Sequence, residues 1–139
     1  LLCFQFTITH RNLTLPAPQL TVFNSPGQSE IALFHHNKRR HFEIPETNFL
    51  PHPEKRILLL SDDAFSSYHT VQPFPLDVLI LSQQESFNLK QLLELFSPSM
   101  IVLDSSLSRY AAARIVRECT ALGIKVHDVA ENGAFSLNF

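Results

Sequence analysis

Three continuous apolar runs constrain the fold of this 139-residue chain more than any other feature. They occupy residues 56–60, 77–81 and 100–104, and each consists of four apolar residues beside a single charged one. Such a run, without alternating polar positions, is typical of a strand that is buried on both faces. The sequence therefore predicts the central strands of a mostly parallel sheet, joined by right-handed crossovers.

Two amphipathic patterns predict helices among these strands. In residues 87–96 the apolar positions recur at helical spacing after Asn88, a favourable N-cap, and Pro98 should end the helix. Residues 110–122 show a second such pattern, closed by Gly123 as the C-cap. The expected inward residues are Leu89, Leu92, Leu93 and Phe96 in the first helix and Ala112, Ile115, Val116, Cys119 and Leu122 in the second.

Shorter apolar segments flank this centre. Residues 20–23, 30–34 and 41–44, separated by turns, predict an N-terminal β-meander, and residues 45–53 and 61–75 predict loops. At the C-terminus we expect a strand at 124–129, a tight Asn-Gly turn and a last strand at 134–137. The expected fold class is α/β, with the meander followed by β-α-β-α-β-β.

Composition narrows the functional class. The chain is 45% hydrophobic and 17% charged, which suits one globular domain. Its net charge of −2 excludes a strongly basic nucleic-acid binder but leaves room for a local basic patch. Cys3 and Cys119 form no CxxC motif, so we expect two buried thiols rather than a zinc site or a disulfide framework.

The chain starts in an apolar stretch, residues 1–6, that is far too short to span a bilayer. It also lacks the basic segment of a signal peptide. We interpret residues 1–19 as a tether or the end of a preceding membrane segment. An ordinary first strand is an equal alternative.

Several segments together resemble a known family. Residues 20–33 read LTVFNSPGQSEIAL, residues 94–106 ELFSPSMIVLDSS, residues 121–128 ALGIKVHD and residues 131–137 ENGAFSL. In order and spacing they resemble the C-terminal metallo-β-lactamase-like domain of ComEC-type competence proteins, in a divergent, Bacteroidetes-like form. The resemblance covers residues 20–139.

That resemblance implies a fold, a setting and a partner. The fold would be a truncated, degenerate metallo-β-lactamase-like sandwich. The parent would be an inner-membrane DNA-uptake channel, with this soluble domain on the periplasmic, extracytoplasmic side. The transmembrane portion of the same polypeptide would be its partner.

The departures from the family pattern bear on catalysis. The family's His-x-His-x-Asp-His should follow Leu60, where residues 61–69 read SDDAFSSYH. Its His-His-Gly-Ser is replaced by SQQES at residues 82–86, and its Tyr-Gly-His-Pro by Tyr-Ala-Ala-Ala from Tyr110. Hydrolysis in that fold depends on two cations that generate hydroxide. We therefore expect no bound metal, no small-molecule cofactor and no enzymatic activity.

Polar residues at the expected strand ends define a candidate remnant cleft, because α/β sheets place ligands at the carboxyl ends of their strands. Backbone amides at the start of the following helix would favour a phosphate there. The purely structural alternative is that these side chains cap helices and accept hydrogen bonds from loop amides. The candidate residues are Asp62, Asp63, Asp104, Ser105, Ser106, Ser108 and Arg109.

The densest basic run gives a second candidate site. His36, Lys38, Arg39 and Arg40 would contact the phosphates of single-stranded DNA, since Lys and Arg supply affinity independent of sequence. A solvated hairpin tip is the simpler interpretation. A metal site at these histidines is disfavoured, because adjacent residues of a strand point to opposite faces.

Three functional hypotheses follow. The first is a non-catalytic accessory domain of a ComEC-like channel, structural or strand-guiding. The second is a phosphodiesterase or nuclease that binds Mg²⁺ or Mn²⁺ through Asp62, Asp63, Asp104 and His69. The third is an interaction domain that packs on its own membrane portion without touching nucleic acid.

Overall fold

The computed structural model describes a mixed α/β fold with two sheets and three helices. The described residues are 19–35, 38–42, 48–50, 55–83 and 87–138. The expected tether at residues 1–19 falls outside them except for Gln19, as do Cys3 and His36.

The first sheet, sheet A, is antiparallel throughout. Its strands are β1 (Gln19–Val22), β2 (Ile31–His35), β3 (Lys38–Phe42) and β9 (Phe135–Asn138), in the order β3-β2-β1-β9. The order of the predicted meander is confirmed, since β1, β2 and β3 are neighbours in chain order. Its third strand starts at Lys38 rather than at His41, so Lys38, Arg39 and Arg40, expected at a hairpin tip, are paired with β2 instead. The last strand joins this sheet beside β1, so the two ends of the described chain are hydrogen-bonded together.

The second sheet, sheet B, holds the three apolar runs. Its strands, in spatial order, are β4 (Asn48–Leu50), β5 (Ile57–Leu60), β6 (Phe74–Leu81), β7 (Phe96–Leu103) and β8 (Val126–Asp128). From β5 to β8 the pairing is parallel, as predicted, and β4 pairs antiparallel with β5. The prediction of a continuous loop at 45–53 is wrong at β4.

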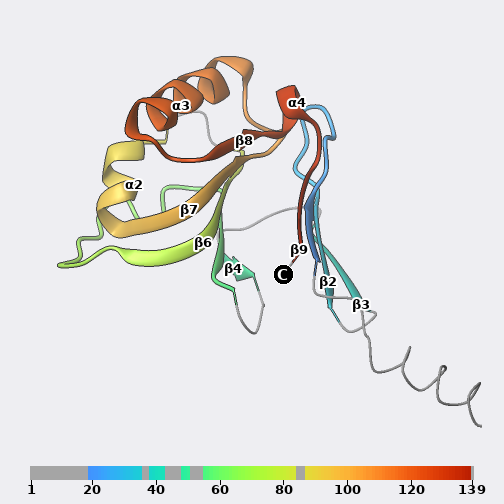
Figure 1. The fold of residues 1–139 in the computed structure, drawn as a ribbon, viewed down its shortest axis with the longest axis horizontal. Helices are drawn as coiled ribbons and strands as arrows, with labels where there is room; N and C mark the ends of the chain where they lie inside the picture. The colour runs from blue at the N-terminus through green and yellow to red at the C-terminus, as the bar shows by residue number, and fades with distance from the viewer. Residues whose placement is uncertain (1–18, 36–37, 43–47, 51–54, 84–86, 139) are drawn as a thin grey trace, which may run out of the picture.

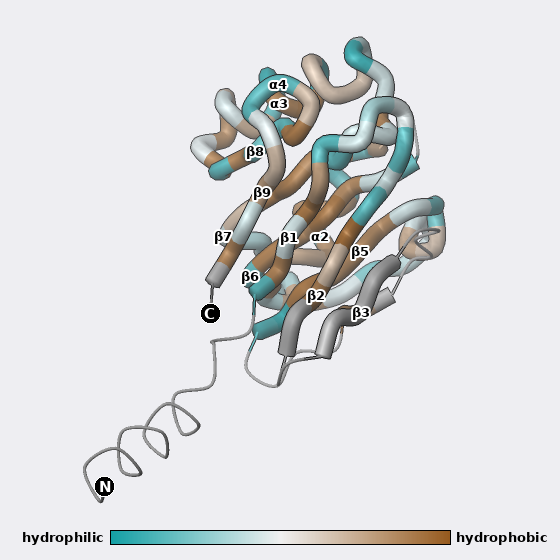
Figure 2. The backbone as a smooth tube through the Cα atoms, turned by 90° about the vertical axis from the view of Figure 1, so that its right-hand side faces the viewer, coloured by the Kyte–Doolittle hydropathy of each residue, from teal (hydrophilic) through white to brown (hydrophobic). Residues whose placement is uncertain are grey.

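The two sheets and the helices form three layers (Figure 1). One apolar cluster fills the space between the sheets, and a second lies between sheet B and the helices. Successive residues of β6 serve both, because side chains of a strand alternate between faces: Ile80 belongs to the first cluster and Leu79 to the second. In Figure 2, sheet A lies in front of sheet B, whose central strands are hydrophobic along most of their length.

Both predicted long helices are present. The first, α2 (Leu89–Leu95), starts at Asn88, whose side chain accepts the Gln91 N–H. The second, α3 (Arg109–Leu122), starts at Ser108 and ends at Gly123 in the left-handed region, φ 72°. That conformation explains the glycine, since a Cβ disfavours positive φ.

Three local predictions are wrong. Pro98 does not end α2, which stops at Leu95, but lies within β7. Pro98 occupies the part of β7 that precedes the pairing with β8 and, lacking an N–H, donates no hydrogen bond to the ladder with β6. Leu122 is 60% exposed rather than inward, at the far end of α3.

The third error concerns the predicted turn at Asn132-Gly133. Residues Val129–Asn132 form a short helix, α4, whose first turn is capped by Asp128. Gly133 then takes φ 87° and directs the chain away from β8 to the other sheet. The final two strands are therefore not a hairpin.

Cys119 confirms the prediction of a buried thiol. It is 0% exposed on the buried side of α3, and burial raises the pKa of its thiol to about 11. At neutral pH it therefore remains a protonated, apolar side chain. Within the described part of the chain, no helix combines the length and apolar character needed to cross a membrane.

Candidate functional site

Polar residues gather where the parallel strands of sheet B end. Ser61 follows β5, Ser82 follows β6, Asp104 follows β7 and Asp128 is the last residue of β8. Parallel strands bring their carboxyl ends to one edge, so these positions share the edge of sheet B that the sequence predicted.

Asp104 is the centre of a buried hydrogen-bonded cluster. It is 0% exposed, and its Oδ1 accepts both the backbone N–H and the hydroxyl of Ser106. The Ser106 hydroxyl oxygen in turn accepts the Gln83 N–H at 2.7 Å and lies 3.3 Å from the Ser82 hydroxyl. Asp104 thereby ties the loop after β7 to the loop after β6.

Two details set this cluster apart from ordinary loop packing. Gln83 takes φ 61°, a conformation in which a residue with a Cβ is strained. Asp104 Oδ2 is buried without a hydrogen-bond partner among the described residues. The two hydrogen bonds from Ser106 to Asp104 Oδ1 hold the loop after β7 in place.

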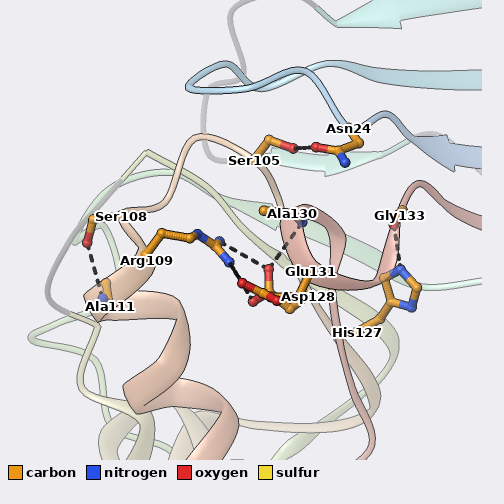
Figure 3. Close-up of polar contacts among 10 residues, drawn as sticks. All are labelled: Asn24, Ser105, Ser108, Arg109, Ala111, His127, Asp128, Ala130, Glu131 and Gly133. Carbon is orange, nitrogen blue, oxygen red and sulfur yellow. Dashed lines mark hydrogen bonds and ion pairs between the residues drawn. The ribbon is translucent and has the colours of Figure 1, made fainter.

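The turn between β1 and β2 covers the same edge. Ser25-Pro26-Gly27-Gln28 closes with the Gln28 N–H on the Ser25 carbonyl, and Gly27 has φ 70°, the geometry of a type II turn. The Gly27 N–H donates to the Ser105 carbonyl at 3.1 Å, and the Ser105 hydroxyl donates to Asn24 at 3.0 Å (Figure 3). Ser105 therefore fastens sheet A to the end of β7.

Arg109 pairs with Asp128 at the end of β8. Its guanidinium donates to both carboxylate oxygens of Asp128, at 3.0 and 3.2 Å, and to Glu131 at 3.3 Å (Figure 3). These hydrogen bonds, chiefly that to Asp128, raise the pKa of Arg109. The Asp128 side chain is only 6% exposed, whereas that of Arg109 is 47% exposed. Asp128 also accepts the Ala130 N–H and so joins α3, β8 and α4.

Asp62 and Asp63 lie in the exposed loop after β5. Asp62 accepts the Ala64 N–H at 3.1 Å, and both line a small pocket of about 100 Å³ against Phe65 and Phe87. That pocket includes neither Asp104 nor Arg109. The residues of the candidate remnant cleft thus form separate groups, one at each strand end.

The metal-binding hypothesis required Asp62, Asp63, Asp104 and His69 to converge. Across the described residues, no three His, Cys, Asp or Glu side chains are placed to hold a metal ion. Ser108 caps α3 by accepting the Ala111 N–H at 3.1 Å. The observed contacts of Asp62, Ser106 and Ser108 are those of loop and helix capping.

The basic run lies elsewhere, on sheet A. Lys38, Arg39 and Arg40 are the first residues of β3, opposite His35, Phe34 and Leu33 of β2. Among the described strands, β3 lies at the edge of sheet A, beside β2. The backbone therefore presents this run at a sheet edge, away from the strand ends of sheet B.

Sequence reasoning missed the residues that complete the edge: Asn24, Ser82, Gln83, Asp128 and Glu131. Ser82 had a usable signal, because it follows an apolar run predicted as a strand, whereas Asp128 lay inside the strand predicted at 124–129. Asn24 and Gln83 had none, since they join the edge through contacts across 81 and 23 residues of chain.

Comparison with known proteins gives one match. The family model described as the ComEC C-terminal domain matches residues 20–139. Neither the curated proteins nor the solved structures contain a match.

Proposed function

Because the chain belongs to the ComEC C-terminal domain family, we propose that it is a non-catalytic accessory domain of a membrane DNA-uptake channel. Membership of this family connects the chain with DNA uptake. Its proposed role is structural or strand-guiding. The proposed fold assignment is a truncated, degenerate metallo-β-lactamase-like sandwich, supported by the facing sheets with helices outside sheet B.

The observation that carries the non-catalytic role is the engagement of the polar edge. Arg109 is held by Asp128 and Glu131, and Ser106 is held by Asp104 and Gln83. A general acid, base or nucleophile needs a side chain that is directed at the substrate. At this edge the same side chains connect loops and elements of the fold.

The setting follows from the family. ComEC proteins are membrane proteins, and we propose an inner-membrane parent with this domain outside the cytoplasm. Its partner would be the membrane portion of the same polypeptide. Single-stranded DNA would contact the basic run at Lys38, Arg39 and Arg40, together with His36.

Retention of labelled oligothymidylate on the immobilised 139-residue chain tests the strand-guiding role. We expect binding at low salt and a marked loss when Lys38, Arg39 and Arg40 are all replaced by Ala. Removal of three phosphate contacts should also reduce the magnitude of the slope of log association constant against log salt concentration by about 2, at roughly 0.7 per contact.

A matched control replaces three exposed cations elsewhere, Lys90, Arg117 and Lys125, with Ala. It changes the net charge equally, so equal losses in the two variants would show only a general charge effect. If the wild-type chain does not retain the oligonucleotide, the strand-guiding role is rejected and packing on the membrane portion is favoured.

A further inference from the structure

Two half-exposed aromatic rings meet beside the amino ends of the parallel strands β5 and β6, at the opposite end of sheet B from the polar edge. Phe49 of β4 is 46% exposed and Phe74 at the start of β6 is 43% exposed. Their ring centroids lie 6.1 Å apart with an interplanar angle of 78°. Arg56 lies over Phe74, with its Cζ 4.9 Å from the ring centroid. We call these three residues the aromatic platform.

The platform lies on the face of sheet B that carries the helices. Phe49 is paired with Leu58, and Leu58 and Leu76 both belong to the core under the helices. Arg56 and Phe74 each precede one of these leucines by two residues, which places them on the same face. The helix layer therefore leaves this end of the face exposed.

The backbone beneath the platform is fixed. The Arg56 carbonyl accepts the N–H groups of Asp77 and Val78 at 2.9 and 3.3 Å. The Arg56 N–H donates to the Asp77 carboxylate at 2.8 Å. These three bonds hold Arg56 at one position beside β6, so the guanidinium reaches Phe74 from an ordered backbone.

The charge of Arg56 indicates the kind of partner. Among the described residues, no carboxylate forms an ion pair with its guanidinium. A guanidinium that forms no ion pair within the described part of the chain, beside two half-exposed rings, is complementary to a chain that carries both flat apolar groups and negative charges. Single-stranded nucleic acid has both, because every base has a stackable face and every nucleotide has a phosphate.

We infer that the aromatic platform is a stacking site for single-stranded DNA, in which a base packs on Phe49 and Phe74 while Arg56 contacts a neighbouring phosphate. This inference rests on the proposed strand-guiding role and adds a base-contacting surface to it. Contact through stacking is tolerant of sequence, which suits a domain that meets DNA of any sequence.

The test is the affinity of fluorescently labelled oligothymidylate, measured by anisotropy for the full chain and for Phe49→Leu/Phe74→Leu. Leucine keeps apolar bulk, so the fold is retained while the π-faces are lost, and circular dichroism verifies this. We expect the affinity to fall at least about fivefold, the lower limit for loss of one stacked base. The control Tyr68→Leu/Tyr110→Leu, at two exposed rings elsewhere, should leave it unchanged.

An abasic oligonucleotide of equal length separates stacking from charge. The wild type and Phe49→Leu/Phe74→Leu should bind it equally, because it has no base to stack.

If the double variant binds oligothymidylate as the wild type does, while the Lys38/Arg39/Arg40 variant does not, the platform is rejected and strand guiding stands. The platform is also rejected if the double variant loses only binding to anionic vesicles. If no variant or wild type binds DNA, both proposals fail.

Discussion

Replacement of Ile80 with Ala should lower the free energy of unfolding by about 2–5 kcal/mol, the usual cost of truncating a buried Ile or Leu. Ile80 is 0% exposed and belongs to the cluster between the two sheets, which also contains Leu20 of sheet A and Val102 of sheet B. Truncation removes the transfer free energy of its outer carbons and leaves a cavity that both sheets line.

Equilibrium unfolding in urea, followed by far-UV circular dichroism, measures this loss. Val71→Ala is the control, since Val71 lies in a loop and is fully exposed, and it should change stability by less than about 0.5 kcal/mol. A loss of the same small size for Ile80→Ala would mean that sheet A does not pack on sheet B as described.

Replacement of Arg109 with Ala should destabilise the domain by about 1–3 kcal/mol, because a buried carboxylate loses its cation. Asp128 is 6% exposed and receives two hydrogen bonds from Arg109. The half-exposed position of Arg109 keeps the expected cost below that of a fully buried pair. Arg109→Lys should retain only part of the stability, because the ammonium keeps the positive charge but lacks the bidentate geometry of the guanidinium.

Arg117→Ala provides the control on the same helix, because Arg117 is exposed. It should cost no more than about 0.5 kcal/mol. Equal effects of Arg109→Ala and Arg117→Ala would show that the contact with Asp128 contributes no stability of its own.

The centre of the fold could be predicted from the sequence because buried strands and helix faces require apolar residues at regular positions. Continuous apolar runs gave three central strands, and helical spacing with caps at Asn88 and Gly123 gave α2 and α3. Each of these signals is local, since it depends on residues within one element.

The errors arose where distant contacts decide the structure. β4 is three residues long and exists through its pairing with β5, while the prolines around it predicted a loop. Asn132-Gly133 has the composition of a hairpin turn, but Asp128 caps a helical turn and β9 pairs with β1. A pairing that joins residues 19 and 138 leaves no local pattern in the sequence.

The candidate site was predictable as an edge but not as a set of partners. The rule that polar residues follow parallel strands located Asp62 and Asp104 at their strand ends. It gave no indication that Arg109 pairs with Asp128, since two residues of opposite charge at different strand ends have several possible partners. The platform had no signal either, because Phe49 and Phe74 are separated by a loop and the whole of β5.

A single incubation tests most directly whether this domain holds DNA without cutting it. The chain is mixed with end-labelled oligothymidylate and Mn²⁺, and the same sample is analysed for bound fraction and for fragment length on a denaturing gel. We predict that the oligonucleotide is bound and keeps its full length. Shortened fragments that disappear in Asp104→Asn would contradict this, because they would make the buried edge a catalytic centre.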